Sequence, residues 1–437
     1  MNEAITTIDS LAFGGNGVCR INGKVCFVPF SCPGDELRIA ITAEKRSYQL
    51  ARIVEVLVPS PSRVTPPCPV FGSCGGCSWQ HIDYAQQLLA KRQILADTLW
   101  RGARVDGDLV RPVLPSPSQY GYRSRVQFKL HTAADKLRIG FFRNNSHTVE
   151  DVGQGCAIAL PVINQALSSL RAVLALFPEK SVIPEISINC AENGAVAVIS
   201  YNGRDSAAAA AFFREQRADL LPLSGLFLDT GRKTGLQNLY GDEQLTYTLP
   251  AVKSEGQPCR LSYRPDGFSQ VNQDQNRAML EVVRRLAAFQ GRESVLDLYC
   301  GNGNFSLPIA RDVADVLGIE EYAGSIAAAN ANKLMNNIRN AEFICSDAVA
   351  GVKRLAAEGR RFDSIIIDPP RAGAAGLVQE LYRLNPDRII YVSCDPSTLA
   401  RDCGLLADSG YLVRECVPLD MFPQTYHLES VTLLRKK

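Results

Sequence analysis

The chain has 437 residues, of which 46% are hydrophobic and 21% are charged. This length suits roughly two to four domains that each bury a core, and the composition excludes a disordered or fibrous protein. No uncharged apolar run approaches the roughly 18 residues of a membrane span. Residues 1–7 also lack a basic region followed by an apolar one, so we expect a cytoplasmic protein that has no signal peptide and contacts no membrane. The formal net charge is only +2, so nucleic-acid binding would depend on local charge.

Short β-forming runs separated by turn residues occupy residues 1–59. We expect turns at residues 13–17 and 33–35, and strands at residues 24–29, 36–42 and 51–58. Several short strands in so few residues are typical of a small barrel. The Pro- and Ser-rich residues 58–62 then predict a domain boundary after residue 59.

Three of the 14 cysteines crowd together at Cys68, Cys74 and Cys77. A chain of this length needs no disulfide framework, so the cluster predicts a metal or iron–sulfur centre in a reducing compartment. The spacing is Cys-x5-Cys-x2-Cys, which differs from the Cys-x3-Cys-x2-Cys of radical S-adenosylmethionine enzymes. On spacing alone, a zinc site with His81 as the fourth ligand remains an alternative.

A basic stretch follows a helix expected at residues 82–101. Residues 91–150 carry 11 Lys and Arg against 5 Asp and Glu. Arg123, Arg125 and Lys129 alternate, so they share one face of a strand. The residues that interleave with them are aromatic: Tyr120, Tyr122, Phe128, Phe141 and Phe142. Cations bind phosphates and aromatic rings stack on bases, which favours RNA binding. A solvated charged face over core aromatics is the alternative.

Residues 60–261 predict a central α+β domain, and from residue 262 strands alternate with helices. The expected strands are 294–299, 316–320, 342–345, 364–367 and 388–392, with terminal strands at 411–417 and 429–435. This alternation predicts an α/β domain with a doubly wound, Rossmann-like parallel sheet. Ligands bind such sheets at the carboxyl ends of the strands.

Three successive strands of this domain end in residues suited to a nucleoside. Gly301 and Gly303 follow the first strand, Glu320 ends the second and Asp347 follows the third. Glycines allow close backbone approach, and the carboxylates can accept hydrogen bonds from ribose and adenine. Because only two glycines are present, S-adenosylmethionine fits better than a dinucleotide. The alternative is that these acidic residues cap helices.

The next two strands run into Asp368-Pro369-Pro370-Arg371 and Ser393-Cys394-Asp395-Pro396. A cysteine at a strand exit can act as a nucleophile, whereas within a core it is inert. Glu429 begins the last strand. From the residues alone we expect Glu429 to be a solvated strand end rather than a general base.

Together these motifs resemble the RNA uracil-5 methyltransferases, particularly the bacterial 23S ribosomal RNA enzymes with a TRAM domain and an iron–sulfur cluster. The resemblance covers essentially the whole chain. The matching segments are residues 68–77 with Cys156, 268–272, 297–304, 368–371 and 393–402. The resemblance implies a TRAM barrel at residues 1–59, an iron–sulfur and RNA-binding domain at 60–261, and a methyltransferase domain at 262–437.

The same resemblance implies site residues. Cys68, Cys74, Cys77 and Cys156 would hold a [4Fe-4S] cluster with a structural role. Cys394 would be the nucleophile and Glu429 the base. The expected contacts of S-adenosylmethionine are Gln270, Tyr299, Asn304, Glu320, Asp347 and Asp368.

The expected activity is therefore methylation of uracil C5 in RNA, in a single-stranded or loop region of 23S rRNA, by a monomer. A tRNA substrate remains an alternative. A cytosine-5 methyltransferase also uses a cysteine, whereas amino-group enzymes carry an aromatic residue where this chain has Arg371. The intact Cys394 and Glu429 argue against a non-catalytic RNA-binding protein.

Overall fold

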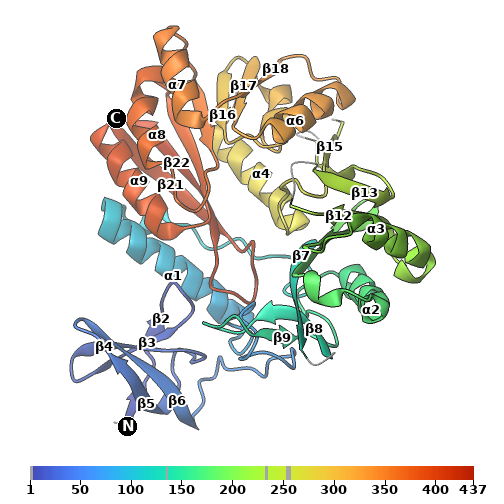
Figure 1. Cartoon of the computed structure of the whole chain (residues 1–437). Coiled ribbons are helices and arrows are strands. Elements are labelled where there is room, and N and C mark those ends of the chain that lie inside the picture. Colours follow the sequence, from blue (N-terminus) through green and yellow to red (C-terminus); the bar gives the residue numbers. More distant parts are fainter. Residues whose placement is uncertain (1–2, 134–135, 232–234, 252–256) are drawn as a thin grey trace.

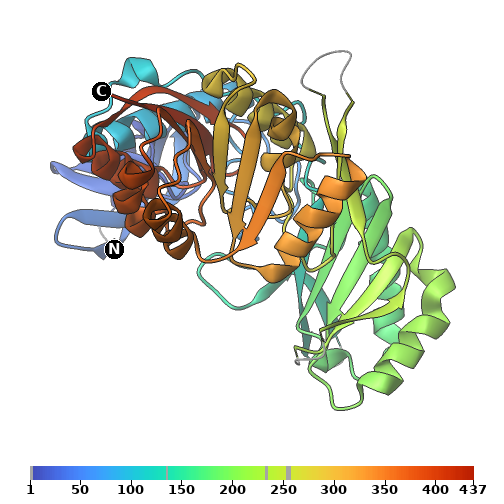
Figure 2. The ribbon, with the colours of Figure 1, turned by 90° about the horizontal axis from the view of Figure 1, so that it is seen from above.

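The computed structural model describes residues 3–133, 136–231, 235–251 and 257–437 (Figure 1). Three large sheets follow one another along the chain, and helices cover the second and third (Figures 1 and 2). Within the described ranges no helix combines the length and apolar character needed to cross a membrane.

The N-terminal sheet has six strands in the order β1-β5-β6-β4-β3-β2. They are β1 (Glu3–Thr7), β2 (Ser10–Leu11), β3 (Gly17–Ile21), β4 (Lys24–Val28), β5 (Glu36–Glu44) and β6 (Tyr48–Val58). The sheet curves around its own small core, which includes Ile8, Leu37 and Ile39, and β1 contacts β3. The predicted strands are confirmed, and the last two are longer than expected.

A buried carboxylate ties this sheet to the segment that follows it. Asp35 is fully buried and accepts hydrogen bonds from the backbone N–H of Cys32 (2.7 Å) and of Ser60 (2.9 Å). Its carboxylate also forms an ion pair with Arg63. Burial alone would raise the pKa of Asp35, but the Arg63 guanidinium and the two backbone N–H groups hold that pKa below its ordinary value.

The central sheet has seven strands in the order β13-β12-β11-β10-β7-β8-β9. They are β7 (Arg125–Ala133), β8 (Lys136–Phe142), β9 (Val149–Asp151), β10 (Glu185–Ala191), β11 (Gly194–Ser200), β12 (Leu223–Asp229) and β13 (Leu236–Tyr240). Helices α2 (Pro161–Leu176) and α3 (Ser206–Glu215) pack with this sheet around one apolar cluster. A hairpin of β14 (Leu245–Leu249) and β15 (Cys259–Tyr263) leads to the third sheet.

The C-terminal sheet has the order β18-β17-β16-β19-β20-β22-β21. Its strands are β16 (Ser294–Leu298), β17 (Asp315–Glu320), β18 (Ala341–Cys345), β19 (Ser364–Ile367), β20 (Arg388–Ser393), β21 (Tyr411–Leu419) and β22 (Glu429–Lys436). β16 to β20 pair in parallel, and β22 and β21 add antiparallel strands. The predicted doubly wound sheet is confirmed, and its strand order reverses between β16 and β19, where such folds bind ligands.

Helices cover both faces of this sheet (Figure 2). They are α4 (Gln273–Ala287), α5 (Ser306–Ile309), α6 (Ala323–Met335), α7 (Ala348–Ala357), α8 (Ala375–Leu381) and α9 (Pro396–Asp408). The strand residues Ile365, Ile366 and Ile367 are fully buried, as expected for a parallel strand covered on both faces. The helix expected from Asn304 begins only at Ser306.

Helix α1 (Tyr84–Ala103) packs against α9 although it precedes the central sheet in sequence (Figure 1). Its buried residues Ile94, Leu95 and Leu99 belong to the same apolar cluster as the core of the C-terminal sheet. The chain after α1 then lies beside β21, where the N–H of Arg111 donates to Cys416 O at 2.9 Å. The domain boundaries expected after residues 59 and 261 remain predictions. Helix α1 belongs to the segment 60–261 but packs on the domain that begins at residue 262.

Candidate active site and cysteine cavity

The antiparallel pairing of β20 and β22 brings Cys394 and Glu429 together. Ser393 pairs with Ser430 at the end of this ladder, so Cys394 leaves β20 next to the point where Glu429 enters β22. Asp368 follows Ile367, which pairs with Tyr391 on the neighbouring parallel strand. Three side chains with reactive protons therefore meet at the carboxyl end of the sheet.

The electrostatics of this group favour protonated forms. Burial raises the pKa of Glu429 well above its ordinary value, the charge of Asp368 raises it further, and Arg371 opposes the shift. Burial, followed by Glu429 and Asp368, raises the pKa of Cys394 to about 11. Burial and the charge of Asp297 raise the pKa of Asp368 to about 7. A cation placed among these groups would lower all three pKa values.

Glu429 is only 5% exposed. The expectation of a solvated strand end, made from the residues alone, is therefore wrong. The expectation fails because Glu429 begins an internal strand of the sheet, between β20 and β21 and near Asp368 and Arg371, and no local pattern shows these neighbours.

A pocket beside this group is lined by four of the residues expected to contact the methyl donor: Gln270, Tyr299, Asn304 and Asp368. Tyr299 has a φ of 64°, a left-handed conformation that is costly for a bulky residue and is typical of functional turns. Gly303 has a φ of 91°, and a Cβ there would lie 2.7 Å from Leu307 Cδ1. The turn after β16 therefore depends on the positions of its glycines.

Asn304 is fixed by partners that the sequence did not indicate. Its amide exchanges two hydrogen bonds with the amide of Asn276, at 2.9 and 3.0 Å. The Tyr247 hydroxyl donates to Asn304 Oδ1 at 3.0 Å. These partners come from α4 and β14, far apart in sequence, so no local spacing could have revealed them.

Glu320 and Asp347 do not line this pocket. Glu320 reaches its edge, because Glu320 Oε2 accepts a hydrogen bond from the N–H of Gly301 at 3.3 Å. Asp347 is exposed and caps α7 by accepting from the N–H of Ala350 at 2.9 Å. The structure thus shows Asp347 acting as a helix cap, the alternative open from the sequence.

The segment 420–428, which leads into Glu429, is held from several directions. Lys91 Nζ lies 2.5 Å from Asp420 Oδ1 and 3.1 Å from Phe422 O, and both ionic side chains are fully buried. One turn earlier on α1, the Gln87 amide exchanges hydrogen bonds of 3.0 Å with the side chain and the backbone N–H of Gln424. No local pattern marks Lys91 or Gln87, since their role depends on contacts with residues more than 300 positions away in the chain.

The turn that carries Arg371 is held by Asp402. Asp402 Oδ2 accepts from the N–H of Ala374 at 2.7 Å and from the Tyr391 hydroxyl at 2.6 Å. A Cβ at Gly373 would lie 2.7 Å from the same carboxylate oxygen. Asp402 thereby joins the turn after β19 to β20, and this connection helps to hold Arg371 near Cys394.

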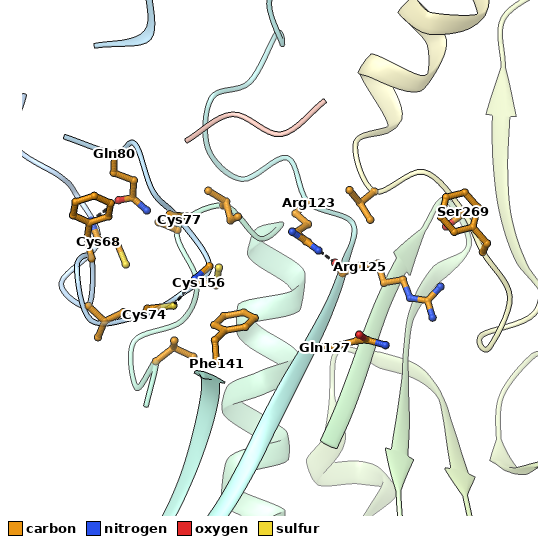
Figure 3. Close-up of a pocket in the computed structure, with 18 residues that line it drawn as sticks. Cys68, Cys74, Cys77, Gln80, Arg123, Arg125, Gln127, Phe141, Cys156 and Ser269 are labelled. Atoms are coloured by element: carbon orange, nitrogen blue, oxygen red, sulfur yellow. Dashed lines mark hydrogen bonds between the residues drawn. The ribbon is translucent and has the colours of Figure 1, made fainter. Parts of the chain in front are cut away.

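The four cysteines expected to hold a cluster share one cavity of about 490 Å³ (Figure 3). Cys68, Cys74, Cys77 and Cys156 lie at one end of it, and Ser269 lies at the other. Gly75 allows the cysteine loop to dock on β8, because a Cβ there would lie 2.8 Å from Phe142 O. Phe268 and Ser269 line both this cavity and the pocket beside Asp368, so the two sites adjoin.

No three His, Cys, Asp or Glu side chains in the described part of the chain are grouped to hold a single metal ion. His81 does not line the cysteine cavity. Its Nε2 lies 3.2 Å from Ser31 O, and its ring packs against Phe30 and Phe71. The zinc alternative with His81 as a ligand is therefore not supported.

The strand that carries the basic residues has the expected two faces. Val126 and Phe128 of β7 are buried, while Arg125, Gln127 and Lys129 alternate with them. Arg125 and Gln127 line the cysteine cavity, as does Arg123, which precedes the strand (Figure 3). Of the interleaved aromatic residues, Tyr122 and Phe128 are core residues, as the alternative interpretation allowed.

Comparison with known proteins decides the family. The profile described as tRNA (Uracil-5-)-methyltransferase matches residues 83–437. The chain belongs to this family. Its members are enzymes, and a second profile, the TRAM domain of tRNA (uracil(54)-C(5))-methyltransferase, matches residues 5–62. The match confirms the TRAM domain expected at the N-terminus and the methyltransferase domain expected at the C-terminus.

Relatives within the family are similar along nearly their whole length. The 23S rRNA (uracil(1939)-C(5))-methyltransferase RlmD of Xanthomonas euvesicatoria is 34% identical over 99% of this chain and 97% of its own. The RlmD protein of Vibrio parahaemolyticus is 33% identical over 98% of this chain and 95% of its own. The crystal structure of Pyrococcus abyssi tRNA (uracil-54, C5)-methyltransferase with S-adenosyl-L-homocysteine has a TM-score of 0.75 at 24% identity, covering 99% of this chain and 100% of that chain. That likeness shows a shared fold.

Proposed function

We propose that the protein transfers the methyl group of S-adenosylmethionine to C5 of a uridine in RNA. The observation that carries the proposal is the meeting of Cys394 with buried Glu429 at the carboxyl end of the sheet. A nucleophile and a base beside a donor pocket are what this chemistry requires. An amino-group methyltransferase would use neither of them.

In this reaction Cys394 adds to C6 of the uracil ring as a thiolate. Formation of the C–S bond shifts the electron pair of the C5=C6 double bond toward C5, which attacks the methyl group of the donor. The bond between that methyl group and the donor sulfur breaks, and S-adenosylhomocysteine leaves with its electron pair. The Glu429 carboxylate removes the proton left on C5. The electron pair of that C–H bond restores the ring double bond, and the thiolate of Cys394 leaves.

The methyl donor supplies an activated methyl group and a positive charge at its sulfur. Gln270, Tyr299, Asn304 and Asp368 would hold it, because they line one pocket and Asp368 lies near Cys394. Glu320 would act at the edge of this pocket through Gly301, and Asp347 would contact the donor from its position at the start of α7. A cation bound beside Asp368 would also favour the ionised forms of Cys394 and Glu429.

A [4Fe-4S] cluster held by Cys68, Cys74, Cys77 and Cys156 is part of the proposal. Each thiolate of such a cluster binds a different iron, so four cysteines around one cavity suit it better than they suit a single ion. The N–H of Gly76 points to Cys74 Sγ at 3.4 Å, the kind of hydrogen bond that stabilises a cluster sulfur. The methyl transfer needs no redox step, so the role assigned to the cluster is structural.

We infer that 23S rRNA is the substrate. Full-length relatives named for that reaction support this assignment, and the family profile and the Pyrococcus abyssi structure make tRNA the second candidate. The target uridine must leave its stack to reach Cys394, which favours a loop or a single-stranded region. Arg123, Arg125 and Phe268 line the adjoining cavity, where they would contact the phosphates and bases of the RNA. Action as a monomer in the cytoplasm remains a prediction.

Mass-spectrometric mapping of 5-methyluridine tests the proposal. RNA from cells without the gene should lack the modification at one or more uridines of 23S rRNA, and the wild-type gene should restore it. A gene encoding Cys394→Ala serves as the control and should restore nothing. Unchanged 5-methyluridine in both rRNA and tRNA of the deleted strain would overturn the proposal.

A further inference from the structure

A second groove, of about 420 Å³, opens between the N-terminal sheet, the cysteine loop and the segment before Glu429. We call it the flanking groove. Its walls come from five separate segments: residues 14–16, 29–30, 75–78, 144–145 and 425–427. No one domain of the fold forms this groove alone.

Four polar side chains on these walls are uncommitted, whereas the hydroxyls of Ser78 and Thr425 already form hydrogen bonds. The amides of Asn16, Asn144 and Asn145 and the imidazole of His427 have no hydrogen-bond partner among the residues that the structure describes. Asn144 and Asn145 are exposed on the turn between β8 and β9. Several free donors and acceptors that converge on one concavity are typical of a binding site.

The chemistry of the walls selects among ligands. Of the residues that the structure describes, no Lys, Arg, Asp or Glu lines the flanking groove, so these walls offer no cation to a phosphate. Burial, followed by the charges of Arg371 and Lys91, lowers the pKa of His427 to about 4, so its ring is neutral and can both donate and accept. Amides, a neutral imidazole and glycine backbone match the edge and face of a neutral nucleobase.

Aromatic rings form one wall of the groove. The Tyr426 and His427 rings lie 4.2 Å apart between centroids and are tilted by 36°. The ring of Phe13 packs edge-on against the ring of Tyr426, with 5.3 Å between their centroids, and this contact helps to fix the Tyr426 ring. Such a wall provides a surface on which a base can stack.

The flanking groove adjoins the reaction site along the chain. His427 lies two residues before Glu429, and the charges of Arg371 and Asp395, from the turns around Cys394, act on its ring. His427 thus connects the wall of the flanking groove to the residues around Cys394.

We propose that the flanking groove, bounded by Asn16, Asn144 and His427, binds an unpaired base of the RNA near the target uridine. The groove reads the hydrogen-bonding edge of that base through the amides and stacks it against His427. This inference rests on the proposed function, and it assigns to the groove a part in choosing which uridine is methylated.

The test combines protein variants with altered RNA. Synthetic fragments around the mapped uridine would carry a single abasic residue at successive positions on either side. The proteins compared would be the wild type, Asn144→Ala with Asn145→Gly, Asn16→Ala, and the matched control Asn330→Ala on α6. Glycine suits position 145 because its φ is 53°. The value of kcat/KM would be measured for each combination of protein and RNA fragment. The S-adenosylhomocysteine binding and the melting temperature of each protein would be measured as well.

At one position, the abasic residue should lower kcat/KM of the wild type and of Asn330→Ala by about tenfold or more. The kcat/KM of the groove variants on intact RNA should fall by a similar factor. The abasic residue should lower the kcat/KM of these variants little further, and their binding of S-adenosylhomocysteine should be unchanged. If the loss from the protein substitution and the loss from the abasic residue multiply at every RNA position, in both groove variants, the two act independently. That result would overturn the inference while leaving the proposed function intact. No methylation of the intact fragment by the wild type would instead be a failure of the proposed function.

Discussion

Cys394 and Glu429 lie next to each other at the ends of the antiparallel strands β20 and β22, one step beyond the pairing of Ser393 with Ser430. The two residues come from segments joined by α9 and β21, so the pairing of the last strand determines their proximity. Their roles can be separated experimentally, because they act at different stages of the proposed reaction.

Replacing Cys394 with alanine should lower methyl transfer by at least about a thousandfold, since C5 of uracil is not activated without the thiolate. Binding of S-adenosylhomocysteine, measured by calorimetry, should be unchanged. Cys345→Ala is the matched control, because Cys345 is exposed at the end of β18. Turnover by Cys394→Ala close to that of the wild type would remove Cys394 from the mechanism.

Glu429→Gln should accumulate a covalent RNA–protein adduct. The amide cannot take the C5 proton, so the C–S bond cannot break after methylation. The adduct should survive a denaturing gel and should be absent from the double variant Cys394→Ala/Glu429→Gln. A Glu429→Gln protein that forms no adduct, yet still binds RNA and methyl donor, would argue against Glu429 as the base.

The activity should rise with pH. Burial raises the pKa of Cys394 to about 11 in the unliganded protein, so the reactive thiolate is a minor species at neutral pH. Because kcat/KM reports ionisations of the free enzyme, it should increase by about tenfold per pH unit between roughly pH 6 and 8. A pH-independent kcat/KM over that range would show that the thiol is already ionised or does not limit the reaction.

Replacing Lys91 with methionine should destabilise the protein by about 3–5 kcal/mol, because it leaves the Asp420 carboxylate buried without its partner. Removing both charges, in Lys91→Met/Asp420→Leu, should recover much of this loss. Denaturant unfolding measures the effect, with the exposed pair Arg354–Glu358 as the control at about 0–1 kcal/mol. Equal costs for the single and the double variant would show that the unpaired Asp420 carboxylate is not the cause of the loss.

Protein purified without air should contain about four irons per chain. Cys156→Ala should lower the iron content, and His81→Gln should not, because His81 hydrogen-bonds to Ser31 outside the cysteine cavity. Elemental analysis and the visible absorption of the cluster are the measurements. One zinc per chain with no iron would contradict the cluster assignment.

The sequence by itself determined the local elements: the barrel strands, the five parallel strands with glycine, acidic or cysteine exits, and the clustered cysteines. These depend on hydrophobic periodicity, turn residues and short motifs, which act between near neighbours. Only the tertiary structure decided that Glu429 is buried beside Cys394 and that α1 packs on the C-terminal sheet. It also showed that Asp347 caps a helix and that Lys91 holds the segment before Glu429. These outcomes depend on strand pairing and burial between segments far apart in the chain, and no local pattern encodes them.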